Sequence, residues 1–439
     1  MSDPVRRRRG ISLCCALAPI AIAPLAGPAC GLIADGPPAA SRDAGAAPAI
    51  DSSVRDAVDP SDAEGAEDAP ALPDAHAPAW TAIGGAVVEG PSLTPPSLAA
   101  AADGTVYVAF GQSARGQPAR DVVERWSGTA WAPLGAIVPT SQLGCAPTLA
   151  LDAAGTLRLA LGYVDTYAPF VSRWSGASWD VEANVVDAGA PTELFYCPTL
   201  AAGANGAGAV VYTSIDAPFV LRFAPFGPAA SAIASLDDMQ HLDGLAATVV
   251  GDQIVSARAR ASTLRLDRWT GAAWEPLGTP FVDEAATDAA GSPIVSRLSM
   301  ATRSDGALIV AYDRASPLRH ELRIVVWQDT VRSVLAGPAA PADARLVGNA
   351  IVAVAPNGTP WLAYDTTPSP DGAWNPDAPG TLHVARFDGT SFVDVGELQQ
   401  ALITGFYDFR FGGDGAPYVA MLAARAAGEA ALVVARYGP

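Results

Sequence analysis

Short runs in which apolar and polar residues alternate fill the chain after residue 78, and Gly, Asp and Ser separate them. The segment 96–135, PSLAAAADGTVYVAFGQSARGQPARDVVERWSGTAWAPLG, contains four such runs. Asp103 and Gly104 lie between the first two, and Ser127 and Gly128 lie between the last two. Glycine tolerates the positive φ that tight hairpin turns require. The segment therefore predicts four short antiparallel β-strands.

Degraded copies of this segment account for nearly all of residues 79–439. The glycine of the first hairpin recurs roughly every 50 residues and defines seven copies, at Gly104, Gly155, Gly206, Gly251, Gly306, Gly358 and Gly415. Four antiparallel strands in about 50 residues, repeated along the chain, are the signature of a propeller blade. We therefore predict an all-β fold, a seven-bladed β-propeller of four-stranded antiparallel blades.

The two ends of this region complement each other. Copy seven stops at Pro439, where its fourth strand should begin. The segment Trp80–Gly85 (WTAIGG) has the same form as Trp131–Gly135 (WAPLG), the fourth strand of copy one. We expect the N-terminal strand to complete the last blade, which closes the ring and removes free sheet edges. This match bounds the propeller at residues 79–439.

Aromatic residues recur at the ends of the third strands and the starts of the fourth strands. The fourth strands begin with Trp131, Trp179, Trp274 and Phe392. We predict that these rings pack between neighbouring sheets, and stacking on a sugar is the alternative. The turns GTAW, GASW, GAAW and GTSF resemble the Asp-box of sialidase-type propellers, although Ser127, Ser175 and Thr270 stand where that motif has Asp. The resemblance implies a fold and carries no activity.

Residues 1–78 have a different composition. A basic start, an apolar run and small residues before Cys30 make residues 1–30 typical of an export signal. Cys30 with Gly31 resembles the lipidation point of a bacterial lipoprotein. Residues 31–78 are rich in Ala, Pro and Asp and poor in large apolar side chains, which predicts a disordered acidic tether. We expect export to the cell envelope or the extracellular space, with membrane contact only through an N-terminal lipid anchor.

Charge and cysteine content narrow the range of partners. The formal net charge is −18, which repels nucleic-acid phosphates. No Cys or Cys/His cluster has metal-ligand spacing, so we expect neither a metal nor a cofactor. Cys145 and Cys197 enter the first strands of successive copies. They form either a disulfide that staples two blades or two buried free thiols.

Candidate ligand-binding residues lie where second strands end and in one long loop. In propellers the loops after these strands gather over one mouth of the central channel. A Tyr-Asp pair offers a flat stacking face beside a hydrogen-bond acceptor. Trp374 lies in the copy-six loop TTPSPDGAWNPDAPGT, outside the repeat pattern, and is the strongest single candidate. The pairs are Tyr163 with Asp165, Tyr312 with Asp313, and Tyr364 with Asp365.

These features favour an exported, surface-tethered, monomeric module that binds a glycan or an envelope protein without catalysis. Two other readings are a sialidase-like carbohydrate-active enzyme and a structural scaffold without a small ligand. An enzyme of that type needs several acids and arginines together at the channel mouth. Arg297 and Arg410 are the arginines that the pattern places near inner strands. No sequence feature assigns catalytic residues.

Overall fold

The structure, a computed structural model, describes much of the unit Leu72–Pro439. The described residues are 78–438 except 91, 114–119, 138–145, 153, 164–167, 185–197, 203–207, 215–219, 227–233, 237–243, 252, 261, 284–294, 316–319, 329–330, 339–343, 369–379 and 426–428. Its secondary structure is β throughout these residues. None of them forms a helix that is long and apolar enough to cross a membrane.

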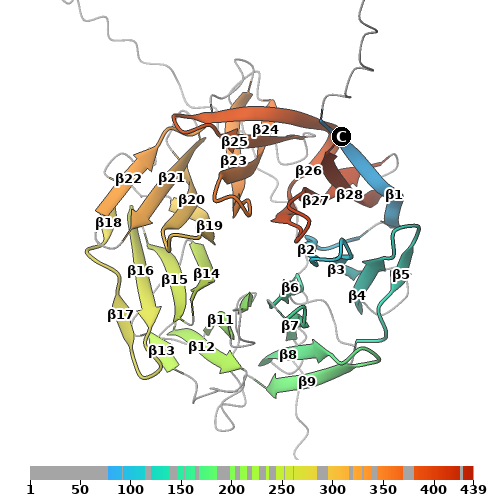
Figure 1. The fold of residues 1–439 in the computed structure, drawn as a ribbon, viewed down its shortest axis with the longest axis horizontal. Helices are drawn as coiled ribbons and strands as arrows, with labels where there is room; N and C mark the ends of the chain where they lie inside the picture. Colours follow the sequence, from blue (N-terminus) through green and yellow to red (C-terminus); the bar gives the residue numbers. More distant parts are fainter. Residues whose placement is uncertain are drawn as a thin grey trace, which may run out of the picture. The chain divides into compact units, whose positions relative to one another are not determined.

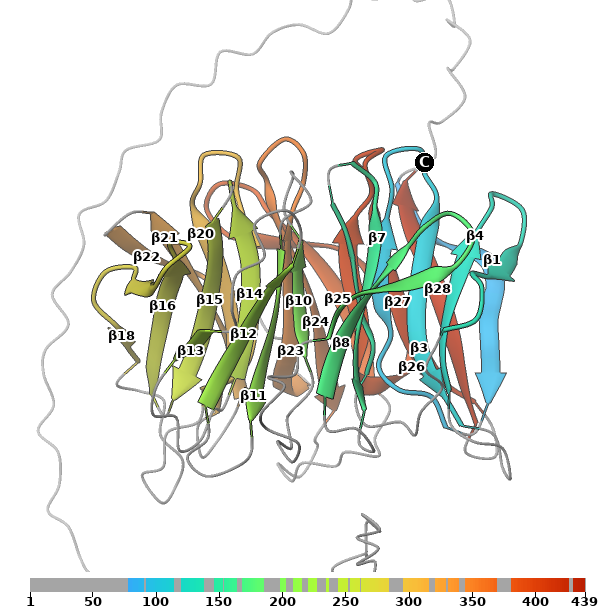
Figure 2. The same cartoon turned by 90° about the horizontal axis from the view of Figure 1, so that it is seen from below.

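Antiparallel sheets surround a common axis, and their strands run between the two faces of the ring (Figures 1 and 2). One sheet holds β2 (Ser97–Ala100), β3 (Val106–Gln112), β4 (Arg120–Trp126) and β5 (Trp131–Pro133). The next holds β6 (Thr148–Leu151), β7 (Leu157–Tyr163), β8 (Ala168–Trp174) and β9 (Trp179–Asn184). It is followed by β10 (Thr199–Ala202), β11 (Gly208–Ser214), β12 (Val220–Phe226) and β13 (Ala234–Leu236).

Two further sheets of the same kind follow in chain order. The first holds β14 (Gly244–Val250), β15 (Gln253–Arg260), β16 (Thr263–Trp269) and β17 (Trp274–Pro276), with β18 (Phe281–Val282) also paired to β16. The second holds β19 (Val295–Thr302), β20 (Leu308–Ala315), β21 (His320–Gln328) and β22 (Val331–Leu335). In each of these five sheets the strand that comes first in the chain lies nearest the axis (Figure 1). The prediction of four-stranded antiparallel blades in a propeller is confirmed.

The blade count differs from the prediction. The described strands form six sheets, because copies six and seven share one sheet of seven strands. Its strands are β23 (Ala344–Val354), β24 (Pro360–Pro368), β25 (Gly380–Phe387), β26 (Phe392–Phe411), β27 (Pro417–Ala424), β28 (Ala430–Gly438) and β1 (Ala79–Gly90). The prediction of seven separate blades is therefore wrong.

The shared sheet exists because β26 serves both copies. Its start pairs with β25, as Phe392 opposite Phe387 shows, and its end pairs with β27, as Phe411 opposite Pro417 shows. Residues 398–406 between these two parts read LQQALITGF and contain no Pro, Asp, Asn or Ser, and a single Gly. Such an apolar, partly β-branched run favours extended backbone over a turn. One strand therefore continues where the repeat pattern predicts a blade boundary.

The N-terminal strand closes the ring, as predicted. β1 pairs antiparallel with β28, with Trp80 opposite Tyr437 and Gly90 opposite Ala430. Figure 1 shows β1 in blue beside β28 in red. Segments separated by most of the chain thus complete one sheet, and closure removes an edge that would otherwise present unpaired N–H and C=O groups.

The paired aromatic residues join neighbouring sheets, which confirms the packing prediction. The rings of Trp126 and Trp131 lie 5.4 Å apart, between centroids, on adjacent strands. The indole N–H of Trp131 donates to the carbonyl of Ile83, at 3.1 Å, in the preceding sheet. Gly84 has a φ of 72°, and a Cβ atom there would lie 2.2 Å from Trp126. The motif Trp-x-x-Ile-Gly thus supplies the hydrogen-bond acceptor and the space for the tryptophan pair of the next sheet.

Candidate functional site

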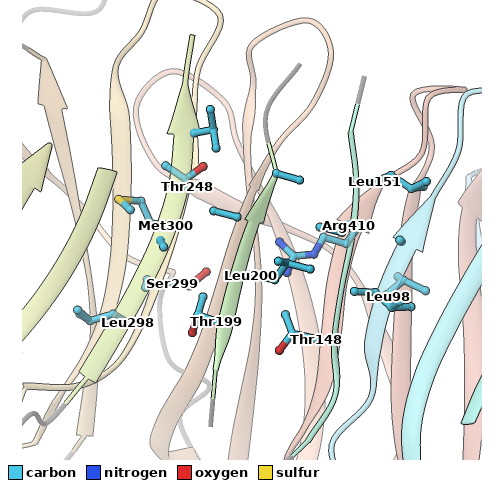
Figure 3. A pocket seen from close by; sticks show the side chains of 18 of the residues that line it. Leu98, Thr148, Leu151, Thr199, Leu200, Thr248, Leu298, Ser299, Met300 and Arg410 are labelled. Atoms are coloured by element: carbon cyan, nitrogen blue, oxygen red, sulfur yellow. The ribbon is translucent and has the colours of Figure 1, made fainter. Parts of the chain in front are cut away.

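A central channel runs along the axis of the ring. The innermost strands β2, β6, β10, β14 and β19, together with the end of β26, enclose a cavity of about 370 Å³ (Figure 3). Its wall is mostly alanine and leucine, with the hydroxyl side chains of Thr148, Thr199, Thr248 and Ser299. Small side chains suit these strands because the sheets crowd together at the axis. The cavity wall is therefore mostly uncharged, and polar groups make up the larger part of the surface that it exposes.

Hydrogen bonds between neighbouring inner strands hold the channel wall in place. Asp408 Oδ2 accepts the backbone N–H of Leu98 at 2.7 Å, across the junction of β26 with β2. Ser97 Oγ accepts the N–H of Leu149 at 2.9 Å, which links β2 to β6. Asp408, at 5% exposure, is almost fully buried. A buried polar group is stable only when it is paired, so these bonds fix the inner strands relative to one another.

Among the lining residues that the structure describes, Arg410 is the one with a charged side chain. Its side chain projects into the cavity from β26 and is 44% exposed (Figure 3). The Nε atom lies 3.3 Å from Asp408 Oδ1. Neither terminal nitrogen is hydrogen-bonded to a described residue, so both can donate to a ligand. The channel thus offers two directed donors next to an otherwise uncharged wall.

The predicted pair Tyr312 and Asp313 lies inside the fold. Tyr312 is 1% exposed, and its hydroxyl donates to Asp283 Oδ2 at 2.8 Å. Burial, followed by this hydrogen bond, raises the pKa of Tyr312 well above its usual range. Asp313 is 4% exposed and accepts the backbone N–H of Asn349 at 2.8 Å. Both side chains therefore join strands of the propeller.

Tyr364 and Asp365 have similar surroundings. The ring of Tyr364 stacks on His383 with centroids 5.1 Å apart, and Asp365 Oδ2 accepts the side-chain N–H of Asn349 at 2.7 Å. Asn349 has a φ of 56°, and it contacts Asp313 and Asp365 from one position. The two predicted pairs thus meet through Asn349, which the sequence did not single out. Their ligand-binding role stays a prediction.

The other candidates lie beyond the described part of the chain. Tyr163 ends β7, but its side chain is not described. The rest lie outside the described residues: Asp165, Trp374, Cys30, Cys145 and Cys197. Lipidation, the disulfide and the role of the copy-six loop remain predictions. No group of three or more His, Cys, Asp or Glu side chains that could hold a metal ion occurs among the residues that were placed.

A second hollow, missed by the sequence interpretation, lies between copies six and seven. We call it the Trp361 groove, a space of about 510 Å³ lined by Pro356, Asn357, Trp361, Arg386, Phe387, Asp388 and Phe411, among others. Its walls come from the turn between β23 and β24, from β24 and β25, from the turn after β25 and from the end of β26 with the turn that follows it. The sequence signal was present, since copy six has Trp and Asp at two positions where other copies have different residues.

Comparison with known proteins gives no family. No protein-family model matches the chain, and no curated protein matches its sequence. Similar solved structures include a fucose-specific lectin from Aleuria aurantia, with 14% identity over 69% of this chain and 95% of the lectin at a TM-score of 0.43. An α-L-arabinanase from Penicillium chrysogenum has 12% identity over 81% of this chain and 98% of the arabinanase, with a TM-score of 0.48.

A sialidase from Trypanosoma rangeli has 10% identity with this chain and a TM-score of 0.43. The match covers 71% of this chain and 56% of the sialidase. This chain therefore spans only about half of the sialidase. At these identities and TM-scores, none of the three carries an argument about this chain. Its function has to be argued from its own residues.

Proposed function

We propose that this chain is a non-enzymatic, exported binding module, and that its propeller binds a glycan whose acidic sugar enters the central channel. One observation carries the proposal: a cavity of about 370 Å³ in which Arg410 is the one charged side chain among the described lining residues. A cavity with a neutral wall and a single directed cation suits recognition of one anionic group.

The chemistry of the wall favours an acidic sugar. A guanidinium group donates two parallel hydrogen bonds to a carboxylate, and both terminal nitrogens of Arg410 are available for this. Thr148, Thr199 and Ser299 lie on other strands of the wall. The Thr148 hydroxyl donates to the carbonyl of Pro198 and the Ser299 hydroxyl accepts the N–H of Val352, so the first can still accept from a sugar hydroxyl and the second can still donate to one. The ligand would therefore meet one ion pair and several neutral hydrogen-bonding groups.

Binding without catalysis fits the same wall. Glycoside hydrolysis generally requires two carboxyl groups that flank the scissile bond. The described lining contains no Asp or Glu, and Arg410 has no second arginine beside it there. The sialidase-like alternative needs a cluster of arginines, and Arg297 lies on β19 with a side chain that is not described. The described wall supports the binding alternative.

The location of the module is proposed from the sequence of residues 1–78. The basic and apolar start, Cys30 and the acidic Ala/Pro/Asp-rich stretch support export and a tethered position at the cell envelope. At that position the accessible glycans are those of the envelope or of the surroundings. An envelope protein is the alternative partner, and we expect the module to act as a monomer. Labelling with a lipid precursor, compared between wild type and Cys30→Ser, tests the anchor.

The binding experiment compares the full chain with two single variants on an array of acidic and neutral glycans. Arg410→Gln removes the channel cation, and Arg425→Gln is the matched control, because Arg425 directly follows β27 of the same sheet, is half exposed and lies outside the lining. We expect wild type and the control to retain acidic glycans and Arg410→Gln to bind them at least about tenfold more weakly.

Two results would reject the proposal. Equal binding of acidic glycans by Arg410→Gln and wild type would show that the channel does not recognise the acidic group. Release of shortened glycan would show catalysis. A third variant, Trp374→Ala, covers the loop candidate, since a loss confined to that variant would assign binding to residues 369–379 and not to the channel.

A further inference from the structure

The Trp361 groove has a rigid aromatic wall. Trp361 contacts Phe411 edge-on, with ring centroids 5.6 Å apart, and it contacts Tyr437 at 5.9 Å. Phe387, which also lines the groove, packs on Phe392 at 5.3 Å. Trp361 is 8% exposed, so most of its surface is fixed by the core and a small part faces the groove. Aromatic surfaces held in this way suit the C–H face of a ligand.

The rim of the groove carries one positive and one negative side chain. Arg386 is exposed and lies directly opposite Trp361 on the neighbouring strand, and no described residue pairs with its charge. Asp388 Oδ1 accepts the backbone N–H groups of Thr390 and Ser391 at 2.8 and 2.9 Å. These bonds lower the pKa of Asp388 to about 2, so its carboxylate is ionised at neutral pH. Its second oxygen has no partner among the described residues.

This combination selects for a neutral ligand with many hydroxyls. A purely anionic or cationic ligand would meet one like charge at the rim, whereas a hydroxyl both donates and accepts and can therefore bond Asp388 and Arg386 together. Asn357 also lines the groove, and its amide oxygen accepts the N–H of Thr359. We propose that the Trp361 groove is a second binding site, separate from the channel, for a neutral sugar unit that lies on the aromatic wall with its hydroxyls toward Arg386 and Asp388.

The repeat pattern supports this assignment independently. The residue three positions after the hairpin glycine is Trp361 in copy six and a smaller aromatic, Tyr107 or Tyr418, in copies one and seven. Copies two, four and five have Arg158, Ile254 and Ile309 there. The turn residue after the third strand is Asp388 in copy six, whereas copies one, two and four have Ser127, Ser175 and Thr270. Both departures line the same groove. The other copies form the same strands with different residues at these two positions, so the strands themselves do not require Trp or Asp there.

The repeat also supplies a substitution that removes the carboxylate without breaking the turn. In copy two, Ser175 Oγ accepts the N–H of Ser178 at 3.1 Å, which is the bond that Asp388 makes to Ser391. Asp388→Ser should therefore keep the turn and lose the charge. Arg386→Gln removes the other charged group. Arg125→Gln is the matched control, because Arg125 holds the same position in copy one and lies outside the groove.

The test measures binding of neutral hexoses and disaccharides to the full chain by isothermal titration calorimetry, with circular dichroism to check the fold of each variant. We expect at least one neutral sugar to saturate wild type, Arg125→Gln and Arg410→Gln with similar affinity. We expect Asp388→Ser and Arg386→Gln to weaken that binding about tenfold each, as the loss of a hydrogen bond to a charged group predicts.

Three results would overturn the proposal: no neutral sugar saturates wild type, Asp388→Ser and Arg386→Gln both bind as wild type does, or Arg410→Gln abolishes the neutral-sugar binding. Binding of a peptide to the groove in place of a sugar would also refute it. Such binding would be lost in Asp388→Ser, and no glycan of the array would compete with it. Because Arg410→Gln is included, the two proposals can fail separately. The channel proposal fails if Arg410→Gln still binds acidic glycans, and the groove proposal fails if Asp388→Ser and Arg386→Gln still bind the neutral sugar.

Discussion

Asp121 provides a direct test of the energetics of this propeller. It lies on β4 opposite Gly111, and its Oδ1 atom is buried without a hydrogen-bond partner among the described residues. Burial raises the pKa of Asp121 from 3.8 to about 7. In the folded state the carboxyl group therefore holds a proton that the unfolded chain releases above about pH 4. Folding becomes less favourable as the pH rises through this window.

The magnitude follows from the size of the shift. A change of one pKa unit corresponds to about 1.4 kcal/mol, so a shift of roughly three units gives an upper bound of about 4 kcal/mol of lost stability above pH 7. Asp121→Asn removes the titration and keeps the shape of the side chain. We expect the variant and wild type to have similar free energies of unfolding near pH 4, and the variant to be the more stable protein at pH 8.

The assay is urea unfolding at a series of pH values from 4 to 8.5, followed by tryptophan fluorescence. Asp103→Asn serves as the control, because Asp103 is exposed and a hydrogen bond from the backbone N–H of Thr105 lowers its pKa. That variant should show no gain at pH 8. The reasoning about Asp121 fails if Asp121→Asn unfolds with the same pH dependence as wild type, or if it is the less stable protein at pH 8.

Three further changes test the contacts that hold the sheets together. Gly84→Ala should cost about 2–4 kcal/mol, because its Cβ would lie 2.2 Å from Trp126 at a φ of 72°, and thermal unfolding measures the loss. Asp408→Ala leaves the buried N–H of Leu98 without an acceptor, and we expect a loss of about 1–3 kcal/mol in urea unfolding. Trp179→Phe removes an indole N–H that donates at 2.7 Å to the preceding sheet, so a drop of about 1–2 kcal/mol is expected by the same method.

Local rules account for the part of the fold that the sequence predicted. The hairpin glycines Gly104, Gly306 and Gly415 have φ values of 82°, 84° and 77°, as tight turns require. Ring closure was predictable because Trp80–Gly85 has the form of a fourth strand, and copy seven stops where its own fourth strand should begin. In both cases the residues that carry the signal lie within a few positions of one another, or form a pattern that recurs.

Features that depend on tertiary context were not predictable in the same way. Whether β26 turns or continues is decided by pairing with β25 and β27 along its whole length, which single-residue propensities describe poorly. Tyr312 and Tyr364 were expected to end second strands, but β20 continues to Ala315 and β24 to Pro368, and the flanking sheets bury both rings. The Trp361 groove combines residues from three separate segments, so no single segment shows it.

The candidate site residues are unevenly distributed around a ring whose repeats are otherwise similar. Trp361 and Asp388 belong to copy six, and Arg410 belongs to copy seven. These two copies are also the ones joined by β26 into one sheet. Because a continuous strand fixes Asp408 and Arg410 relative to β25, the channel cation and the Trp361 groove are held on one rigid element, which favours precise recognition. The shared sheet therefore carries the side chains on which both proposed sites depend, while the inner strands of the other five sheets complete the channel wall.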